Sequence, residues 1–224
     1  MATIAAENLL KAILELGENG EEVIAARLAE FLRISSAAVS MALKRLERKG
    51  HVKISRKKAI SLTRQGFRAA SALVRRHRLV ERLLTDMLRM PWEHVHEEAE
   101  KLEHAISPEL EKRLIEIFGS NGTCPHGSPF TPSQSLRQRA NCFRLRDASE
   151  NDCLRVVGIN ELHEKEKDFV NSLAVLRLVP GSTLTLLRKT FDGVLELKVG
   201  NRKALFSNQT GARIWVEKAK LKKR

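Results

Sequence analysis

Residues 35–62, SSAAVSMALKRLERKGHVKISRKKAISL, change from one hydrophobic period to another at Gly50. Before this glycine, Val39, Leu43 and Leu46 recur at the three- and four-residue spacing of a helix that buries one face. After it, apolar and polar residues alternate on both sides of a short basic turn, which is typical of two paired strands. The stretch therefore predicts a helix that ends near Gly50, followed by a β-hairpin.

Two further helices are predicted upstream, over residues 4–16 and 21–32, because apolar residues recur at helical spacing in both. Ser35 or Ser36 then supplies the N-cap of the third helix. Three helices followed by a basic hairpin form the winged helix-turn-helix arrangement, in which the start of the third helix meets base edges in the major groove. The alternative is a small helical domain whose basic face is only solvated.

Residues at the start of the third helix are expected to face bases, and the basic side chains that come after them are expected to contact phosphates. The set comprises Ser36, Ala37, Ser40, Met41, Lys44, Arg45, Arg48, Arg56, Lys57 and Lys58.

The charge of the chain favours a polyanionic partner. Its 40 Lys and Arg residues against 27 Asp and Glu residues give a formal net charge of +13. Residues 41–68 alone hold ten basic residues against the single acidic residue Glu47, whereas residues 71–120 are slightly acidic. Because the basic stretch coincides with a predicted recognition helix, it indicates double-stranded DNA more than an acidic membrane surface.

The composition is otherwise that of an ordinary globular protein. Of the 224 residues, 42% are hydrophobic and 30% are charged, enough for two or three small domains with their own cores. No apolar run approaches the length of a membrane span, and Glu7 and Glu15 interrupt the region where a signal peptide would be apolar. Three cysteines without regular spacing argue against a disulfide scaffold and favour a cytoplasmic protein.

The middle of the chain predicts a helical domain. A long helix is expected from Thr63 to Met90, where Pro91 breaks it, and further helices are expected over 92–106 and 108–119. The apolar stripe of the long helix is wider than a linker needs, so pairing with a second copy in a homodimer is expected. The alternative is that the stripe packs only within its own chain.

Downstream, the composition changes twice. Residues 121–150 contain three prolines and predict a linker, and short alternating segments after residue 151 predict a small barrel-like β domain. The predicted fold class is therefore mainly α with a small β domain. The predicted domains are a winged helix-turn-helix at 1–70, a helical metal-binding and dimerisation domain at 71–120, the linker at 121–150 and the β domain at 151–224.

Histidine and glutamate residues recur at helical spacing in the middle domain. Glu100, Glu103 and His104 stand at i, i+3 and i+4, and His96 lies one turn earlier. A second histidine–glutamate pair at i, i+4 begins at His77. Helices that present such pairs build the metal sites of helical bundles, although a solvated polar face is the alternative. No phosphate-binding loop or hydrolase motif accompanies them, so the chain is predicted not to be an enzyme.

The run RRHRLVERLL at 75–84, followed by HEEAE at 96–100 and by Glu103-His104, resembles the diphtheria toxin repressor and manganese transport regulator family. These are bacterial metal-dependent repressors that control iron or manganese homeostasis. The resemblance covers most of the chain and implies a winged helix-turn-helix, a helical dimerisation domain and an SH3-like domain related to ferrous-transport protein A. It thus implies a cytoplasmic, homodimeric repressor that binds a double-stranded DNA operator when loaded with metal.

The resemblance also implies a primary, activating metal site. Glu100, Glu103 and His104 match three of its ligands, and Asn8 stands where the N-terminal helix of the family usually supplies Met or Asp. Lys11 stands where some manganese-specific members have a second carboxylate, so a two-manganese cluster of that kind is not expected. Iron-type members carry a cysteine in place of Glu100. The oxygen-rich set here therefore favours Mn²⁺, with Fe²⁺ next, while Zn²⁺ or Co²⁺ would bind in vitro.

An ancillary site is implied as well. Cys124 and His126 lie in a CPHG segment through which three-domain manganese regulators complete this site, although Cys124 could instead be a plain linker thiol. Phe169 occupies the position of a further expected ligand. The implied ancillary ligands are His77, Glu81, His96, Cys124, His126 and Glu166.

Two other functions remain as alternatives. A structural DNA-binding protein that ignores metal would keep its DNA affinity in the presence of a chelator. A metal-buffering protein or a metalloenzyme would bind metal with an affinity that operator-length DNA does not change.

Overall fold

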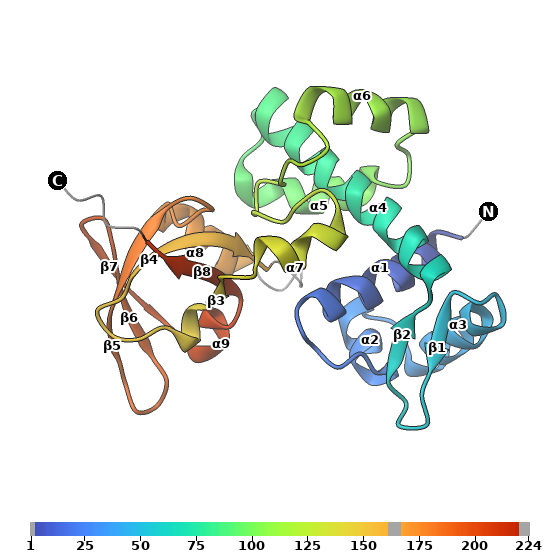
Figure 1. Ribbon diagram of the computed structural model, residues 1–224, viewed down its shortest axis with the longest axis horizontal. Coiled ribbons are helices and arrows are strands. Elements are labelled where there is room, and N and C mark those ends of the chain that lie inside the picture. The colour runs from blue at the N-terminus through green and yellow to red at the C-terminus, as the bar shows by residue number, and fades with distance from the viewer. Residues whose placement is uncertain (1–2, 161–166, 220–224) are drawn as a thin grey trace. The chain divides into compact units, whose positions relative to one another are not determined.

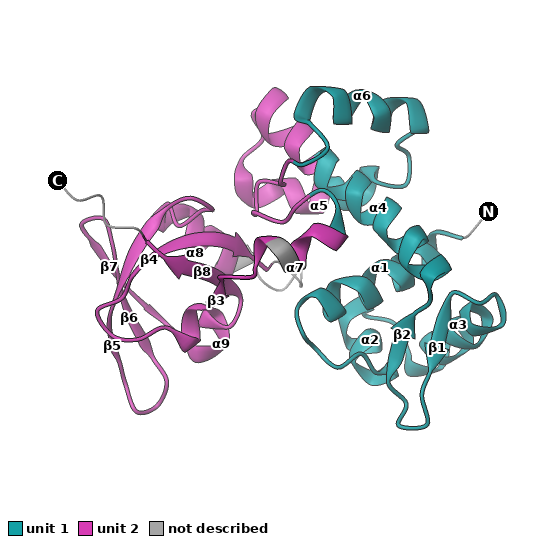
Figure 2. Ribbon diagram, viewed as in Figure 1, with its two compact units in different colours: residues 1–80, 99–121, 130–132 teal, residues 81–98, 122–129, 133–224 magenta. Residues whose placement is uncertain are grey.

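The computed structural model of the protein describes residues 3–160 and 167–219, within two compact units (Figure 2). Unit 1 comprises residues 1–80, 99–121 and 130–132, and unit 2 comprises residues 81–98, 122–129 and 133–224. The boundary passes through two helices, α4 (Arg64–Arg82) and α5 (Val95–Leu102), so neither unit is one continuous stretch of chain.

Unit 1 contains three short helices, a hairpin, the first part of α4 and a later helix (Figure 1). Besides α4, its elements are α1 (Ile4–Glu18), α2 (Ala25–Leu32), α3 (Ser36–Arg48), β1 (Val52–Ile54), β2 (Ile60–Leu62) and α6 (Pro108–Phe118). The strands pair antiparallel, with Val52 opposite Leu62. Ser35 caps α3, because its side-chain oxygen accepts a hydrogen bond from the Ala38 N–H at 3.1 Å. The predicted winged helix-turn-helix is thus confirmed.

One apolar core joins the helices of this winged fold. Leu9 and Leu16 of α1, Leu28 of α2, Leu43 of α3 and Val74 of α4 are all almost completely buried in it. Burying one such side chain contributes roughly 1.5–3 kcal/mol. Helix α1 and α3, the helix predicted to contact DNA, therefore share one core.

The long middle helix is shorter than predicted. It is α-helical only to Arg82, and a π-helical turn, η1 (Leu83–Met87), comes directly after it. Of its apolar stripe, Leu73 is buried within the chain, whereas Met87 and Leu88 are more than half exposed. Packing within the chain therefore accounts for part of the stripe, and its end is left on the surface.

The next helix also differs from the prediction. The segment expected to be helical over 92–106 begins with a 3-10 turn, η2 (Trp92–His94), and α5 ends at Leu102. Glu103 and His104 therefore lie in the turn after α5, which the hydrogen bond from the Glu103 N–H to the Ala99 carbonyl stabilises at 2.9 Å.

Unit 2 contains a six-stranded antiparallel sheet in the order β3-β8-β4-β5-β6-β7. Its strands are β3 (Phe143–Arg144), β4 (Cys153–Ile159), β5 (Thr183–Lys189), β6 (Leu195–Val199), β7 (Arg202–Phe206) and β8 (Ile214–Lys218). Three short helices accompany it, α7 (Ser135–Gln138), α8 (Lys167–Leu176) and α9 (Asn208–Gly211). Leu154, Leu186 and Val216 lie in its core. Residues 143–148, predicted as the end of the linker, contribute β3 and the fully buried Leu145 to this domain.

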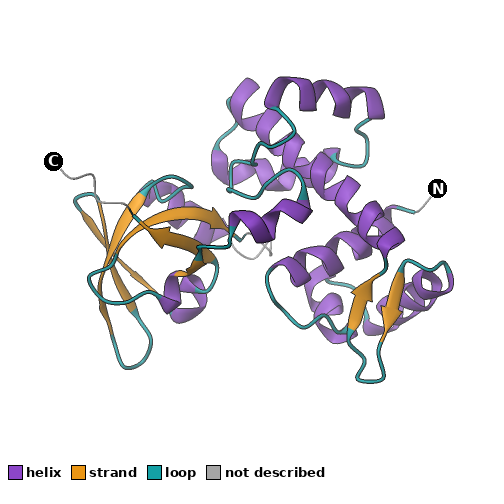
Figure 3. Cartoon of the chain, in the orientation of Figure 1, coloured by secondary structure: helices purple, strands orange, loops and turns teal. Residues whose placement is uncertain are grey.

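Figure 3 shows most of the strands in the six-stranded sheet and most of the helices outside it. The predicted fold class, mainly α with a small β domain, is confirmed. Within the described residues, no helix is both long enough and apolar enough to cross a membrane.

Candidate metal centre

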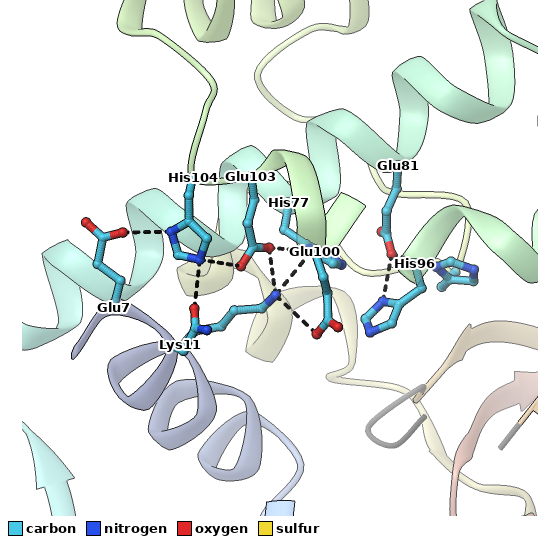
Figure 4. Close-up of polar contacts among 10 residues, drawn as sticks. Glu7, Lys11, His77, Glu81, His96, Glu100, Glu103 and His104 are labelled. Atoms are coloured by element: carbon cyan, nitrogen blue, oxygen red, sulfur yellow. Dashed lines mark hydrogen bonds and ion pairs between the residues drawn. The ribbon is translucent and has the colours of Figure 1, made fainter. Parts of the chain in front are cut away.

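A buried lysine lies among charged side chains in unit 1. The Lys11 ammonium nitrogen, on α1, is 2.7 Å from Oε2 of Glu103 and 3.9 Å from Oε1 of Glu100 (Figure 4). The same Glu103 oxygen accepts a hydrogen bond from Nδ1 of His77 at 2.5 Å. The Lys11 and Glu103 side chains are only 7% and 2% exposed, so this pair of charges is held almost out of water.

A second group of donor atoms meets at His104. Its Nδ1–H donates to Oε2 of Glu7 at 2.8 Å, and its Nε2 lies 2.8 Å from Oδ1 of Asn8 and 3.6 Å from Oε1 of Glu103. Donor atoms that share one small divalent ion in octahedral geometry lie about 3 Å apart, since each is about 2.1 Å from the ion. The Asn8 amide oxygen, the His104 imidazole and the Glu103 carboxylate therefore have the spacing of a metal ligand set.

We call these residues the first cluster, which comprises Glu7, Asn8, Lys11, His77, Glu100, Glu103 and His104. Helix α1 supplies Glu7, Asn8 and Lys11. Asn8 and Lys11 are three positions apart, which puts them on one side of the helix, and Glu7 flanks Asn8. The leucines of α1 fill the core of unit 1 and hold the helix in register. Glu100 is more exposed than its neighbours in the cluster, with 44% of its side chain accessible against 2% for Glu103.

The charges of the first cluster shift one another's pKa values. Burial by itself raises the pKa of Glu103, but the hydrogen bond from His77 and the Lys11 ammonium lower it to about 2. Burial likewise acts to lower the pKa of Lys11, but the carboxylates of Glu15, Glu103 and Glu100 raise it above its ordinary value. Glu103 is therefore ionised at neutral pH, which is the form of a carboxyl group that binds metal.

A second cluster, formed by Glu81, His96, Cys124 and His126, lies in unit 2. Oε1 of Glu81 is 3.1 Å from Nδ1 of His96 and 3.1 Å from Nδ1 of His126. Donor atoms of Glu81, Cys124 and His126 all lie within 4.8 Å of one another, and the three residues are buried. The carboxylate, thiol and imidazole of these three residues suit a transition-metal ion, and His96 adjoins them through its contact with Glu81.

The loop that carries Cys124 and His126 is held against β4. The Ile159 N–H donates a hydrogen bond to the His126 carbonyl at 2.9 Å. Gly127 has a φ of +88°, and a Cβ atom there would come within 2.2 Å of the Val157 carbonyl oxygen, so only glycine fits. The loop therefore presents both candidate ligands from a backbone with a defined position.

The predicted ligands are divided between the two clusters. His96, implied as an ancillary ligand, contacts Glu81 in the second cluster. His77 donates to Glu103 in the first cluster, and its implied role as an ancillary ligand stays a prediction. Glu166 lies outside the described residues, so its predicted role as a ligand stays a prediction.

Glu7 was not predicted to have a role. Its partner His104 is 97 residues away in the sequence, so no local pattern reveals their contact. The only hint is its position one residue before Asn8.

The side chains predicted to contact DNA are exposed without exception. Ser36, Ala37, Ser40 and Met41 are accessible at the start of α3, and the basic side chains of α3 and of the β1–β2 turn are accessible as well. Lys58 has a φ of +64°, which places it in the left-handed region at the tip of the hairpin. The surface that the sequence assigns to DNA is therefore open to solvent among the described residues of unit 1.

A winged helix with an exposed basic recognition helix, built in one unit with an imidazole–carboxylate cluster, defines a metal-responsive DNA-binding protein. Family models match along the chain in the same order. Residues 1–60 match the N-terminal DNA-binding domain of iron-dependent repressors, residues 63–132 match their metal-binding and dimerisation domain, and residues 143–218 match the FeoA domain.

Known relatives extend over nearly the whole chain. The iron-dependent repressor IdeR of Mycobacterium leprae is 31% identical over 222 residues, covering 95% of this chain and 96% of the relative. The diphtheria toxin repressor of Corynebacterium diphtheriae is 33% identical over 198 residues, covering 85% and 87%. The chain therefore belongs to the iron-dependent repressor family, a family of metal-dependent transcriptional repressors rather than enzymes.

Solved structures support the same assignment. A manganese-dependent transcriptional repressor in complex with manganese superimposes with a TM-score of 0.82 at 28% identity, covering 96% of this chain and all of the other. IdeR of T. acidophilum gives a TM-score of 0.79 at 25% identity, covering 98% of this chain and all of the other. The predicted family membership is thus confirmed.

Proposed function

We propose that this protein is a homodimeric repressor that binds operator DNA when Mn²⁺ or Fe²⁺ occupies the first cluster. The ligands would be Asn8, Glu100, Glu103 and His104. The observation that carries the proposal is the position of His104 Nε2 between two oxygen donors. It lies 2.8 Å from Oδ1 of Asn8 and 3.6 Å from Oε1 of Glu103. As a repressor, the protein would act in the cytoplasm beside the chromosome.

The chain's own residues suggest how metal binding reaches the DNA surface. Asn8 belongs to α1, whereas Glu103 and His104 come after α5, so the ligand set joins two segments that are distant in sequence. A divalent ion bound there supplies positive charge that both segments share. Since α1 and α3 pack in the same core, fixing α1 would fix the position of α3. Two such units in a dimer would then present their α3 helices to two half-sites.

The donor set favours manganese over iron. Two carboxylates and an amide oxygen are hard donors, the one imidazole is a borderline donor, and the set lacks a thiolate. Relatives include both iron-dependent and manganese-dependent repressors, and a solved relative binds Zn²⁺. Zn²⁺ or Co²⁺ would therefore also bind in vitro, because affinity alone does not set selectivity in cells.

The second cluster is proposed as an ancillary metal site. Glu81, His96, Cys124 and His126 would bind a metal ion within unit 2 and attach the loop at 122–129 to the segment that carries His96. The buried positions of Glu81, Cys124 and His126 support this role over that of a plain linker thiol for Cys124.

The test is a titration of fluorescently labelled promoter DNA with the protein in chelator, Mn²⁺, Fe²⁺ or Zn²⁺, measured by anisotropy under anaerobic conditions. We expect specific binding only with metal, and strongest activation by Mn²⁺. Equal affinity in chelator would instead identify a metal-independent DNA-binding protein. Glu103→Ala should abolish the metal response, whereas Glu81→Ala should only weaken it.

A further inference from the structure

Trp92 contacts the loop of the second cluster and the sheet domain of unit 2 at the same time. Its indole N–H donates a hydrogen bond to the carbonyl of Pro125 at 3.3 Å, and its ring centroid lies 4.8 Å from that of His126. Trp92 also packs against the apolar core of the six-stranded sheet, and η2, the turn that carries it, lies against α8. One aromatic side chain therefore joins the loop at 122–129 to the sheet domain.

Trp92 belongs to the same short segment as His96. Pro91 restricts the backbone just before it, and the His94 N–H donates to the Pro91 carbonyl at 2.9 Å, which closes the turn. His96 follows one turn later, and its ring centroid lies 6.4 Å from that of His126. The segment therefore supplies one candidate ligand and also the ring that contacts another.

Backbone contacts hold the same loop on β4. The Ile159 N–H donates to the His126 carbonyl at 2.9 Å. Within the loop, the Gly127 N–H donates to the Cys124 carbonyl at 3.0 Å, so the two candidate ligands of the loop lie in one closed turn. These are contacts between groups of the chain itself, so they need no bound ion.

We propose that Trp92 is a positioning residue that preforms the second cluster by holding Cys124 and His126 beside His96 before an ion binds. This inference rests on the proposed ancillary metal site. Its candidate ligands come from three segments, namely α4, α5 and the loop at 122–129. Ligands that are already ordered lose less conformational entropy on binding, so a preformed site binds its ion more tightly.

The alternative is that Trp92 only fills the core of the sheet domain. Phe143, on β3, packs against the same core and provides the comparison. Loss of either aromatic side chain should lower the free energy of unfolding. Only the loss of Trp92 should also release the loop, and that release changes both the reactivity of the Cys124 thiol and the metal affinity.

The first experiment measures the position of the loop without metal. All proteins carry Cys142→Ser and Cys153→Ser, so Cys124 is the one thiol of the chain. Its reaction with an aromatic disulfide is followed in chelator under native conditions. Because Cys124 is only 4% exposed, the parent protein should react slowly, and Trp92→Leu should react about 10-fold faster through local opening of the loop. Trp92→Phe keeps a ring against His126 and should react nearly as slowly as the parent, and so should Phe143→Leu.

The second experiment measures the Co²⁺ affinity of the second cluster in the same proteins. A Co²⁺ ion that binds the Cys124 thiolate gives a sulfur-to-metal charge-transfer band in the near ultraviolet. The first cluster contains no cysteine, so this band reports the second cluster alone. Trp92→Leu should weaken Co²⁺ binding about 10-fold, the lower end of the range for residues that orient metal ligands. Trp92→Phe should restore most of the affinity, and Phe143→Leu should leave it unchanged although the protein unfolds at a lower urea concentration.

The outcomes distinguish this inference from the proposed function. A parent protein without the band binds no metal at Cys124, so the proposed ancillary site itself would be wrong. If the band is present and Trp92→Leu matches the parent in either measurement, the metal site stands and the role of Trp92 is overturned. The role is also overturned if Phe143→Leu changes both measurements as much as Trp92→Leu does. Should Trp92→Leu not fold, Trp92→Met, which fills more of the same space, takes its place.

Discussion

Glu7 orients the imidazole of His104 from the side opposite its candidate metal-binding nitrogen. Because Nδ1–H donates to the Glu7 carboxylate at 2.8 Å, Nε2 remains the nitrogen that can bind metal. Removing such a partner of a ligating histidine typically lowers metal affinity about 10- to 100-fold. We therefore expect Glu7→Gln to weaken Mn²⁺ binding within that range, as measured by titration calorimetry. Glu22→Gln, on the loop before α2, should leave the affinity unchanged, and equal affinities for the two variants would remove Glu7 from the site.

Glu103 makes the stability of the metal-free protein depend on pH. Its pKa in the folded protein is lowered from 4.5 to about 2, so its stabilising effect is complete above pH 4.5 and disappears as the pH falls towards 2. Glu15 acts in the opposite direction, because burial raises its pKa and its protonation on acidification relieves a cost. In chelator, the free energy of unfolding should fall over this window by about 3 kcal/mol more for the parent protein than for Glu103→Gln. Urea unfolding at several pH values measures the difference, and parallel curves would contradict it.

Glu100 separates a manganese site from an iron site at the level of one donor atom. Glu100→Cys replaces a hard oxygen with a shorter, softer sulfur that prefers Fe²⁺, Co²⁺ or Zn²⁺. The variant should lose most of its Mn²⁺-dependent DNA binding and keep activation by Fe²⁺ or Co²⁺ in anaerobic anisotropy measurements. Glu109→Cys, exposed at the start of α6, is the matched control and should behave like the parent. An undiminished Mn²⁺ response of Glu100→Cys would place Glu100 outside the ligand set.

At the scale of secondary-structure elements, the β1–β2 turn is an exposed basic segment of unit 1. Arg56, Lys57 and Lys58 are all exposed there, and each phosphate contact contributes about 0.9 to the slope of log affinity against log salt concentration. Replacing all three with Ala should lower affinity for specific and random DNA alike and reduce the slope by up to about 3. Lys203→Ala, on β7 of unit 2, should not change the slope. A triple variant with the parent slope would move the DNA contact to another surface.

The elements that the sequence predicts well are those with a strong apolar period. Val39, Leu43 and Leu46 mark α3 because each faces the core, and all three are buried. The edge strand β7 escapes prediction because only Phe206 of its five residues is buried, so no alternation is visible. The end of α5 at Leu102 is not predicted either. The polar residues after Leu102 continue the helical spacing, although the backbone forms a turn there.

Prediction of the site fails for a different reason. The spacing of Glu100, Glu103 and His104 is visible within five residues, so a metal-binding segment is predictable. Their partners on α1 are 92 to 97 residues away, and no local pattern marks Glu7, while only the family resemblance draws attention to Lys11. Only the tertiary packing of α1 shows that Glu7 contacts His104 and that Lys11 contacts Glu103.

At the scale of the whole molecule, metal and DNA must act on each other equally. If metal at the first cluster raises operator affinity by a given factor, operator DNA must raise metal affinity by the same factor, typically between about 5-fold and 150-fold. Because α1 belongs both to the first cluster and to the core that holds α3, we expect this coupling to depend on the ligand contacts of α1. The measurement compares Mn²⁺ affinity with and without an operator duplex, using a scrambled duplex of equal length as the control.

Asn8→Ala tests the origin of that coupling. It removes the candidate ligand on α1 and leaves Glu100, Glu103 and His104 unchanged. Metal should then bind more weakly, and operator DNA should no longer tighten it, because no ligand of the ion would belong to the helix that packs with α3. Coupling that survives in Asn8→Ala would mean that metal reaches the DNA surface by a route other than α1. The absence of coupling in the parent protein would favour a metal-buffering protein over a repressor.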